Sequence, residues 1–122
     1  MATVTAGKEN FEKLIENSSI LFVDFWAEWC GPCKMFGPIF EKATGSHPDI
    51  VFAKVDTELE PELAGAAGIS SIPTLMAFRD GILLYREAGA LPEKQFEELI
   101  SAVRAVDMES VRAEIEKEKA KS

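Results

Sequence analysis

Residues 22–34 of the chain read FVDFWAEWCGPCK, and this stretch holds the only two cysteines among 122 residues. Its first half belongs to an apolar run that starts at Ile20 and carries a single carboxylate, Asp24. A continuous apolar run of this kind is typical of a central strand that is covered on both faces. The second half breaks into WCGPC at 29–33, where proline suits the first turn of a helix. We therefore predict a buried strand followed at once by a helix that starts at the cysteine pair.

The rest of the sequence predicts an α/β domain with a central mixed β-sheet flanked by helices on both faces. Asp80-Gly81 lies between two apolar runs and is a strong hairpin signal, whereas the earlier crossovers through helices favour parallel strands. The predicted elements are a helix over 9–17, a strand over 20–26, a helix from Cys33 to Ala43, a strand over 50–56, a helix over 61–67, strands over 74–78 and 82–85, and a helix from Pro92.

The character of the chain changes after about Ala105, where charged residues dominate and large apolar residues become few. We therefore assign residues 1–106 to the domain and residues 107–122 to a polar helical C-terminal extension. A solvated extension on a monomer is expected, and the alternatives are docking on the domain or pairing with a second chain through Val111 and Ile115. Ion pairs three residues apart would support this helix: Glu114 with Lys117, Glu116 with Lys119, and Glu118 with Lys121.

The composition fits a soluble globular protein, with 47% hydrophobic and 28% charged residues. A formal net charge of −8 argues against binding to nucleic acid, which requires basic patches. The longest apolar run is far too short to span a bilayer, and the start of the sequence lacks the pattern of a signal peptide. We therefore expect a cytoplasmic protein that is not bound to a membrane.

Two cysteines separated by two residues at the start of a helix have a specific chemical use. Free N–H groups and the helix dipole stabilise a thiolate at Cys30, and the thiolate is the form that attacks a disulfide. Cys33, one turn later, is placed to attack the mixed disulfide, while Gly31 permits close approach of a partner backbone and Pro32 fixes the helix entry. A zinc site needs four ligands, and the chain offers the two cysteines and His47, so only dimerisation would complete one. A chemically inert pair of buried cysteines is the remaining alternative. The spacing of the two cysteines favours a redox pair, and we expect no bound metal.

Three motifs in order carry a family resemblance: VDFWAEWCGPCKM at 23–35, SIPTL at 71–75 and GAL at 89–91. They are similar to the active-site segment and the second and third signatures of the thioredoxin family. The resemblance covers about residues 5–105 and implies the thioredoxin fold and the activity of a protein disulfide reductase. It also implies two kinds of partner, disulfide-containing client proteins and a flavin-dependent thioredoxin reductase that supplies electrons from NADPH. Because the chain has no Gly-rich dinucleotide motif, we expect no cofactor on the chain itself.

Asp24 has two interpretations. Lys54 is an opposite charge in the neighbouring predicted strand, and the two charges would satisfy each other where neither could be buried alone. One interpretation is therefore a buried ion pair with a structural role only. The resemblance implies instead that Asp24 lies beneath Cys33 and accepts its proton through water, with Lys54 tuning the acidity of Asp24.

The resemblance also implies a substrate-binding surface around Cys30. A cis peptide bond between Ile72 and Pro73 would lie against the cysteines and present its backbone to an extended client chain. Asp56 and Glu58 are expected near the same end, where they would weaken contact with acidic partners. A thioredoxin-fold oxidase or isomerase and a redox-linked chaperone or docking module are the alternative functions. The residues assigned to the surface are Trp29, Gly31, Pro32, Ile72, Pro73, Gly89 and Ala90.

Overall fold

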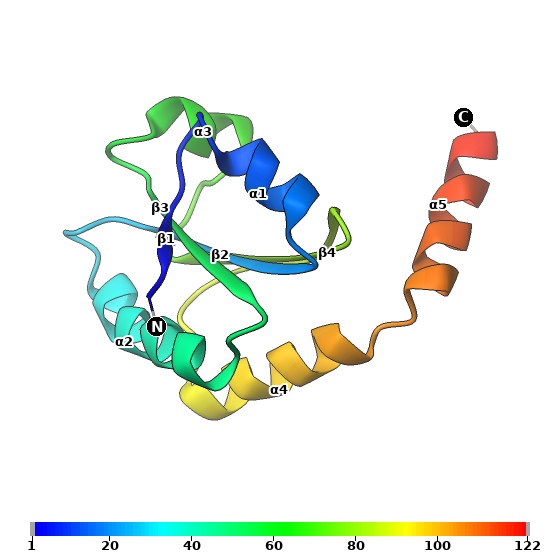
Figure 1. The fold of residues 1–122 in the computed structure, drawn as a ribbon. Coiled ribbons are helices and arrows are strands. Elements are labelled where there is room, and N and C mark those ends of the chain that lie inside the picture. Colours follow the sequence, from blue (N-terminus) through cyan, green and yellow to red (C-terminus); the bar gives the residue numbers. More distant parts are fainter. Residues whose placement is uncertain (1, 122) are drawn as a thin grey trace.

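A mixed five-stranded sheet forms the centre of the computed structural model, which describes residues 2–121 (Figure 1). The strand order is β1-β3-β2-β4-β5, with β2 in the middle. β1 and β2 both run parallel to β3, whereas β4 runs antiparallel to β2 and β5. This arrangement confirms the predicted mixed sheet. The strands are β1 (Val4–Thr5), β2 (Ile20–Trp26), β3 (Val51–Asp56), β4 (Thr74–Arg79) and β5 (Ile82–Ala88).

Four helices cover the sheet, two on each face, and a fifth projects from the domain (Figure 1). α2 and α4 cover one face, whereas α1 and α3 cover the other. The helices are α1 (Phe11–Asn17), α2 (Gly31–Ser46), α3 (Pro61–Ala66), α4 (Glu93–Ala105) and α5 (Met108–Lys121).

β2 is central because its side chains are apolar on both faces. Phe22 points toward α2 and α4, and its ring lies 5.8 Å from that of Phe52 and 5.6 Å from that of Phe96, measured between centroids. Val23 and Phe25 belong to the cluster on the opposite face. Each buried aromatic side chain stabilises the fold by about 1.5–3 kcal/mol. This packing holds the C-terminal end of β2, and therefore the cysteine pair that follows it, in a fixed position.

The structure differs from the predicted elements mainly at their ends. β1 was not predicted, because two residues are too few to show a periodic pattern. α2 starts at Gly31 and runs through Gly45 to Ser46, and it ends where Pro48 disfavours a helical conformation in the preceding residue. β5 extends three residues beyond the predicted end at 85. Pro92 precedes α4 as its N-cap instead of being its first residue.

The junction between α4 and α5 is held by Arg79 at the end of β4. Its guanidinium donates hydrogen bonds to the carbonyl oxygens of Val103, Arg104 and Val106, at 3.1, 2.9 and 2.8 Å. Met108 is 5% exposed and anchors the start of α5 against the domain. These contacts fix the point at which α5 leaves the domain.

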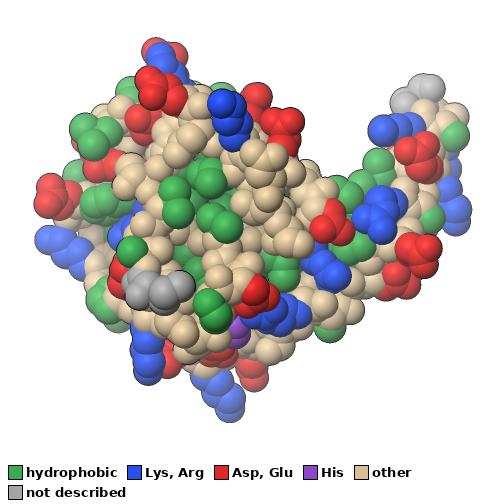
Figure 2. All heavy atoms as spheres, in the orientation of Figure 1, with side chains coloured by type: hydrophobic (Ala, Val, Ile, Leu, Met, Phe, Trp, Pro, Cys, Tyr) green, Lys and Arg blue, Asp and Glu red, His purple; other side chains and the backbone are tan. Residues whose placement is uncertain are grey.

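Beyond this junction, α5 extends away from the sheet, and charged side chains of both signs are interspersed along it (Figure 2). Val111 and Ile115 are half-buried, and hydrophobic side chains lie on the side that faces the domain. The three predicted ion pairs are present, with N–O distances of 3.8, 3.8 and 3.9 Å, and exposed pairs of this kind stabilise a helix only slightly.

Candidate functional site

The cysteine pair lies between the C-terminal end of β2 and the first turn of α2. Cys30 is the N-cap of α2, and its Sγ accepts the backbone N–H of Cys33 at 3.2 Å. The two residues form a disulfide, with Cα atoms 5.2 Å apart. Pro32 occupies the first turn, where a missing N–H costs no helical hydrogen bond. After reduction, a thiolate at Cys30 would lie against the free N–H groups of the helix start, which lower the pKa of a thiol.

Both sulfur-bearing residues are almost covered, and residues of the active-site segment surround them. Cys30 is 3% exposed and Cys33 is 4% exposed, whereas Trp29 beside them is 69% exposed. Gly31 and Pro32 are also exposed. Cys30 is therefore itself covered but is flanked in sequence by exposed aromatic and backbone surface.

The second and third motifs meet the first at this site. The carbonyl oxygen of Ile72 lies 3.6 Å from Cys30 Sγ, and the Ile72–Pro73 peptide bond is cis. Gly89 donates its N–H to the carbonyl oxygen of Pro73 at 2.7 Å, which ties the third motif to the second. Ala90, in contrast, is half-buried and packs against the core cluster under α4. Of the seven predicted surface residues, Trp29, Gly31, Pro32 and Gly89 are exposed, Ile72 and Ala90 are half-buried, and Pro73 is buried.

Asp24 lies in the middle of β2 and is completely buried. Within residues 2–121 neither of its carboxylate oxygens has a hydrogen-bond partner. Burial raises the pKa of Asp24 from 3.8 to about 7, and the positive charge of Lys54 lowers this pKa in part. A carboxyl group with a pKa near neutrality is suited to accepting and returning a proton.

Lys54 faces Asp24 in the strand register but does not pair with it. The ammonium group lies 4.6 Å from the centroid of the Trp26 ring, in a cation–π contact. The interpretation of Asp24 and Lys54 as a direct buried ion pair is therefore wrong. The long lysine side chain instead reaches a hollow of about 350 Å³, which Cys33 also lines. This hollow gives the buried cysteine a route to solvent.

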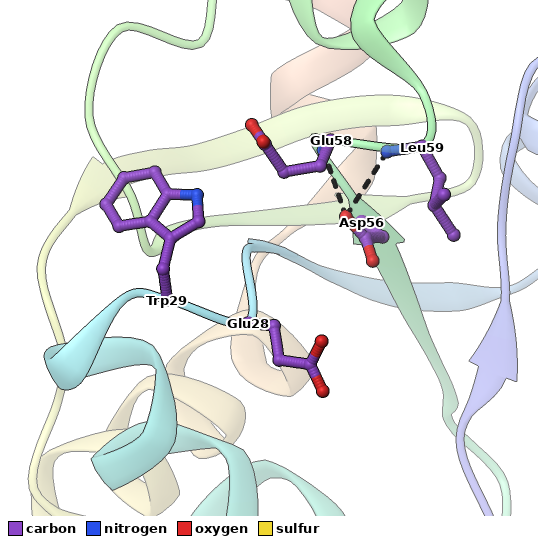
Figure 3. Close-up of a pocket in the computed structure, with 5 residues that line it drawn as sticks. All are labelled: Glu28, Trp29, Asp56, Glu58 and Leu59. Atoms are coloured by element: carbon purple, nitrogen blue, oxygen red, sulfur yellow. Dashed lines mark hydrogen bonds between the residues drawn. The ribbon is translucent and has the colours of Figure 1, made fainter.

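A second hollow, of about 560 Å³, lies beside Trp29 (Figure 3). It is lined by Glu28, Trp29, Asp56, Glu58 and Leu59. Asp56 and Glu58 thus lie at the active-site end, as the sequence predicts. The sequence did not single out Leu59, because the pattern of a single exposed leucine in a loop carries no signal.

His47 lies in a different part of the molecule, at the end of α2. Its Nε2 lies 2.8 Å from Oε1 of Glu97, and its Nδ1 lies 2.9 Å from a guanidinium nitrogen of Arg104. These contacts tie the end of α2 to α4, so His47 does not join the cysteines. Over residues 2–121, no cluster of three or more His, Cys, Asp and Glu side chains is arranged to hold a metal ion. In the same range, no helix combines the length and hydropathy needed to cross a membrane.

The comparisons with known proteins agree on one family. The thioredoxin family model matches residues 2–102. A putative thioredoxin 2 from Streptomyces coelicolor is 49% identical over 121 residues, which are 99% of this chain and 90% of that relative. A thioredoxin from Alicyclobacillus acidocaldarius is 38% identical over 103 residues, covering 84% of this chain and 98% of that protein. Among solved structures, oxidised mitochondrial thioredoxin 3 from Saccharomyces cerevisiae has a TM-score of 0.75 at 32% identity, covering 82% of this chain and 94% of the other.

Proposed function

The chain belongs to the thioredoxin family and is a thiol-disulfide reductase, and we propose that Cys30 attacks the client, Cys33 releases it and Asp24 moves the proton. The observation that supports this division of roles is the position of Cys30 Sγ at the N-cap of α2, with Cys33 one turn later. Only the first of the two sulfurs benefits from the free N–H groups of the helix start.

The reaction proceeds in two exchanges. The Cys30 thiolate attacks one sulfur of the client disulfide, whose S–S bond breaks as a mixed disulfide forms and the other client sulfur leaves as a thiolate. Cys33 then loses its proton and attacks Cys30 Sγ, which breaks the mixed disulfide. The client leaves with both sulfurs reduced. Its two electrons come from Cys30 and Cys33, which are oxidised to a disulfide.

Asp24 accepts the proton of Cys33 in the second exchange, through a bridging water. Two features support this role: the two carboxylate oxygens lack a hydrogen-bond partner among residues 2–121, and burial raises the pKa of Asp24 to about 7. Lys54 tunes the site because its positive charge lowers that pKa. A carboxyl group with this pKa takes a proton from a thiol near neutral pH and returns it afterwards.

The client chain binds across the exposed backbone and aromatic surface around Cys30. An extended segment lies along the Ile72–Pro73 loop, where backbone contacts favour accessible, partly unfolded chains over a particular side-chain sequence. The binding residues are Trp29, Gly31, Pro32, Ile72, Pro73 and Gly89, with Ala90 supporting the loop from beneath.

A flavin-dependent thioredoxin reductase returns the disulfide to two thiols with electrons from NADPH. This partner follows from family membership and from the lack of a Gly-rich dinucleotide motif in the chain, which leaves flavin and nicotinamide to the reductase. We place the cycle in the cytosol, where the reducing pool keeps client thiols reduced, and we assign it to a monomer.

Trapping of the mixed disulfide tests the roles of the two cysteines. A Cys33→Ser variant should form a stable adduct with a disulfide-containing client, because the second exchange cannot occur. Cys30→Ser, the matched variant, should form little adduct, since Cys33 lies inside α2 and not at the helix start, where free N–H groups favour the thiolate of Cys30. Non-reducing gel electrophoresis and mass spectrometry report both results. Equal trapping by the two variants would overturn the assignment of Cys30 as the nucleophile.

A further inference from the structure

The hollow beside Trp29 combines three kinds of surface next to the reactive cysteine (Figure 3). Three large apolar side chains of residues 2–121 are more than two-thirds exposed: Trp29 at 69%, Met35 at 71% and Leu59 at 76%. Two of the three, Trp29 and Leu59, line this one hollow. Trp29 immediately precedes the nucleophile Cys30 in sequence, and exposed apolar groups that face a common hollow beside a reactive residue indicate a surface that a client covers.

Carboxylates complete the walls of the hollow. Asp56 Oδ1 accepts the backbone N–H groups of Glu58 and Leu59, at 2.9 and 3.3 Å, which fixes the loop that carries all three residues. The Glu58 side chain extends over the hollow toward the indole, whereas the Glu28 carboxylate points away from it (Figure 3). The negative charge near the indole therefore comes from Asp56 and Glu58.

We propose that this hollow binds a lysine or arginine side chain that neighbours the target cysteine of a client, so that the chain reduces cationic disulfide segments preferentially. The inference rests on the proposed function and adds a side-chain preference to it. A long cationic side chain matches all three surfaces. Its aliphatic stem packs on Leu59, its charge lies over the face of Trp29, and the carboxylates of Asp56 and Glu58 neutralise it.

The molecule itself contains one example of the central contact. Lys54 Nζ lies 4.6 Å from the centroid of the Trp26 ring, and both residues line the neighbouring hollow, which shares Glu28 with this one. In that contact the lysine belongs to the chain. At Trp29 the indole and the acidic groups are present in the same hollow, and the cation would come from the client.

Single-turnover kinetics with a scanned peptide series test the proposal. Each peptide contains one cysteine as its 2-thiopyridyl disulfide, so attack by reduced Cys30 on the peptide sulfur forms a mixed disulfide and releases 2-thiopyridone, which is followed by absorbance. Lysine or glutamine is placed at each position from three residues before the cysteine to three after it. At one or two positions we expect the lysine peptide to react about fivefold faster than the glutamine peptide, as for a partly exposed cation–π and ion-pair contact.

Two matched variants separate the hollow from the general negative charge of the protein. Glu58→Gln should reduce the lysine preference to about twofold or less at those positions. Glu98→Gln removes the same charge from the exposed side of α4, on the opposite face of the sheet from α3, and should leave the preference unchanged.

Three results would overturn the inference: no lysine preference at any position, a preference of the same size at every position, or equal effects of the two variants. A failure of every peptide to release 2-thiopyridone is distinguishable from these, because it would also contradict the reductase function on which the inference rests.

Discussion

Asp24 and Lys54 face each other across β2 and β3, yet the ammonium group of Lys54 lies over the Trp26 ring and the Asp24 carboxylate has no protein partner within residues 2–121. The lysine therefore acts on Asp24 at a distance through its charge and does not neutralise it by contact. This arrangement leaves Asp24 with a pKa of about 7, a value that a direct ion pair would lower. A carboxyl group with this pKa changes its protonation state near neutral pH.

The raised pKa of Asp24 predicts a specific dependence of stability on pH. Between about pH 4 and 7 the folded chain keeps a proton on Asp24 that the unfolded chain has lost, so stability falls as the pH rises and is lowest above pH 7. Asp24→Asn removes this effect. In urea unfolding of the oxidised protein, the stability of Asp24→Asn relative to wild type should therefore rise by about 2–3 kcal/mol between pH 5 and pH 8.

Asp49→Asn is the control for this experiment. Its contact with Arg104 holds the pKa of Asp49 at about 2, below its ordinary value, so any contribution of Asp49 is already complete at pH 5. The difference in unfolding free energy between Asp49→Asn and wild type should stay constant from pH 5 to pH 8. The same constant difference for Asp24→Asn would contradict a raised pKa at Asp24.

Removing the positive charge of Lys54 should raise the pKa of Asp24 further. Lys54→Met keeps most of the unbranched side chain and removes the ammonium group, so the change acts mainly through charge. Carbon-13 NMR titration of the Asp24 carboxyl group in oxidised protein measures the shift directly. Lys34→Met, a control from the same hollow, should leave the Asp24 titration in place. An unchanged titration in Lys54→Met would rule out the tuning role.

Arg79 should hold the junction of α4 and α5. In Arg79→Met three carbonyl groups lose their guanidinium donor, and we expect amide hydrogen exchange in α5 and the last turn of α4 to accelerate about tenfold or more. Arg86→Met is the control, because Arg86 donates to the carbonyl oxygens of Ala67 and Gly68 after α3. In Arg86→Met the faster amide hydrogen exchange should be confined to the end of α3. Unchanged exchange in α5 of Arg79→Met would show that Met108 alone secures the junction.

A chain shortened to residues 1–106 should retain the reductase reaction. The cysteine pair follows the last residue of β2, Trp26, whereas the first residue, Ile20, pairs with Arg79 beside the α4–α5 junction. The extension and the site therefore lie at opposite ends of this strand. We expect kcat/KM for a client disulfide to change by less than about twofold. A tenfold loss in a folded, shortened chain would assign the extension a part in client binding.

The sequence predicted the parts of this fold that have a strong local signal. β2 is a continuous apolar run, and Asp80 and Gly81 both adopt the positive φ angles that a tight hairpin turn requires. The ends of elements were harder, because they depend on contacts with distant residues. β5 continues to Ala88 since its last residues pair with β4, from Tyr85 with Ala77 to Ala88 with Thr74, and no local pattern in 86–88 reveals this.

The chemistry of the site was predictable where it depends on neighbours in sequence, as it does for Cys30 and Cys33. The chemistry of the site was less predictable where the direction of a side chain decides which residues it contacts. The sequence placed Asp24 and Lys54 on adjacent strands, but it did not show that the lysine turns to Trp26. Nor did it show that Leu59 and Trp29, thirty residues apart, share one hollow. Both facts follow from how loops and long side chains pack after the sheet has formed.

The most direct test of the central claim is reduction of insulin disulfides in the presence of NADPH and a thioredoxin reductase. Wild-type protein should support rapid oxidation of NADPH, followed at 340 nm, and Cys30→Ser should abolish it while the variant stays folded. This result would establish the reductase reaction and its nucleophile together. If the folded wild-type protein, with both thiols free, gave no turnover, or if Cys30→Ser retained it, the account would be contradicted.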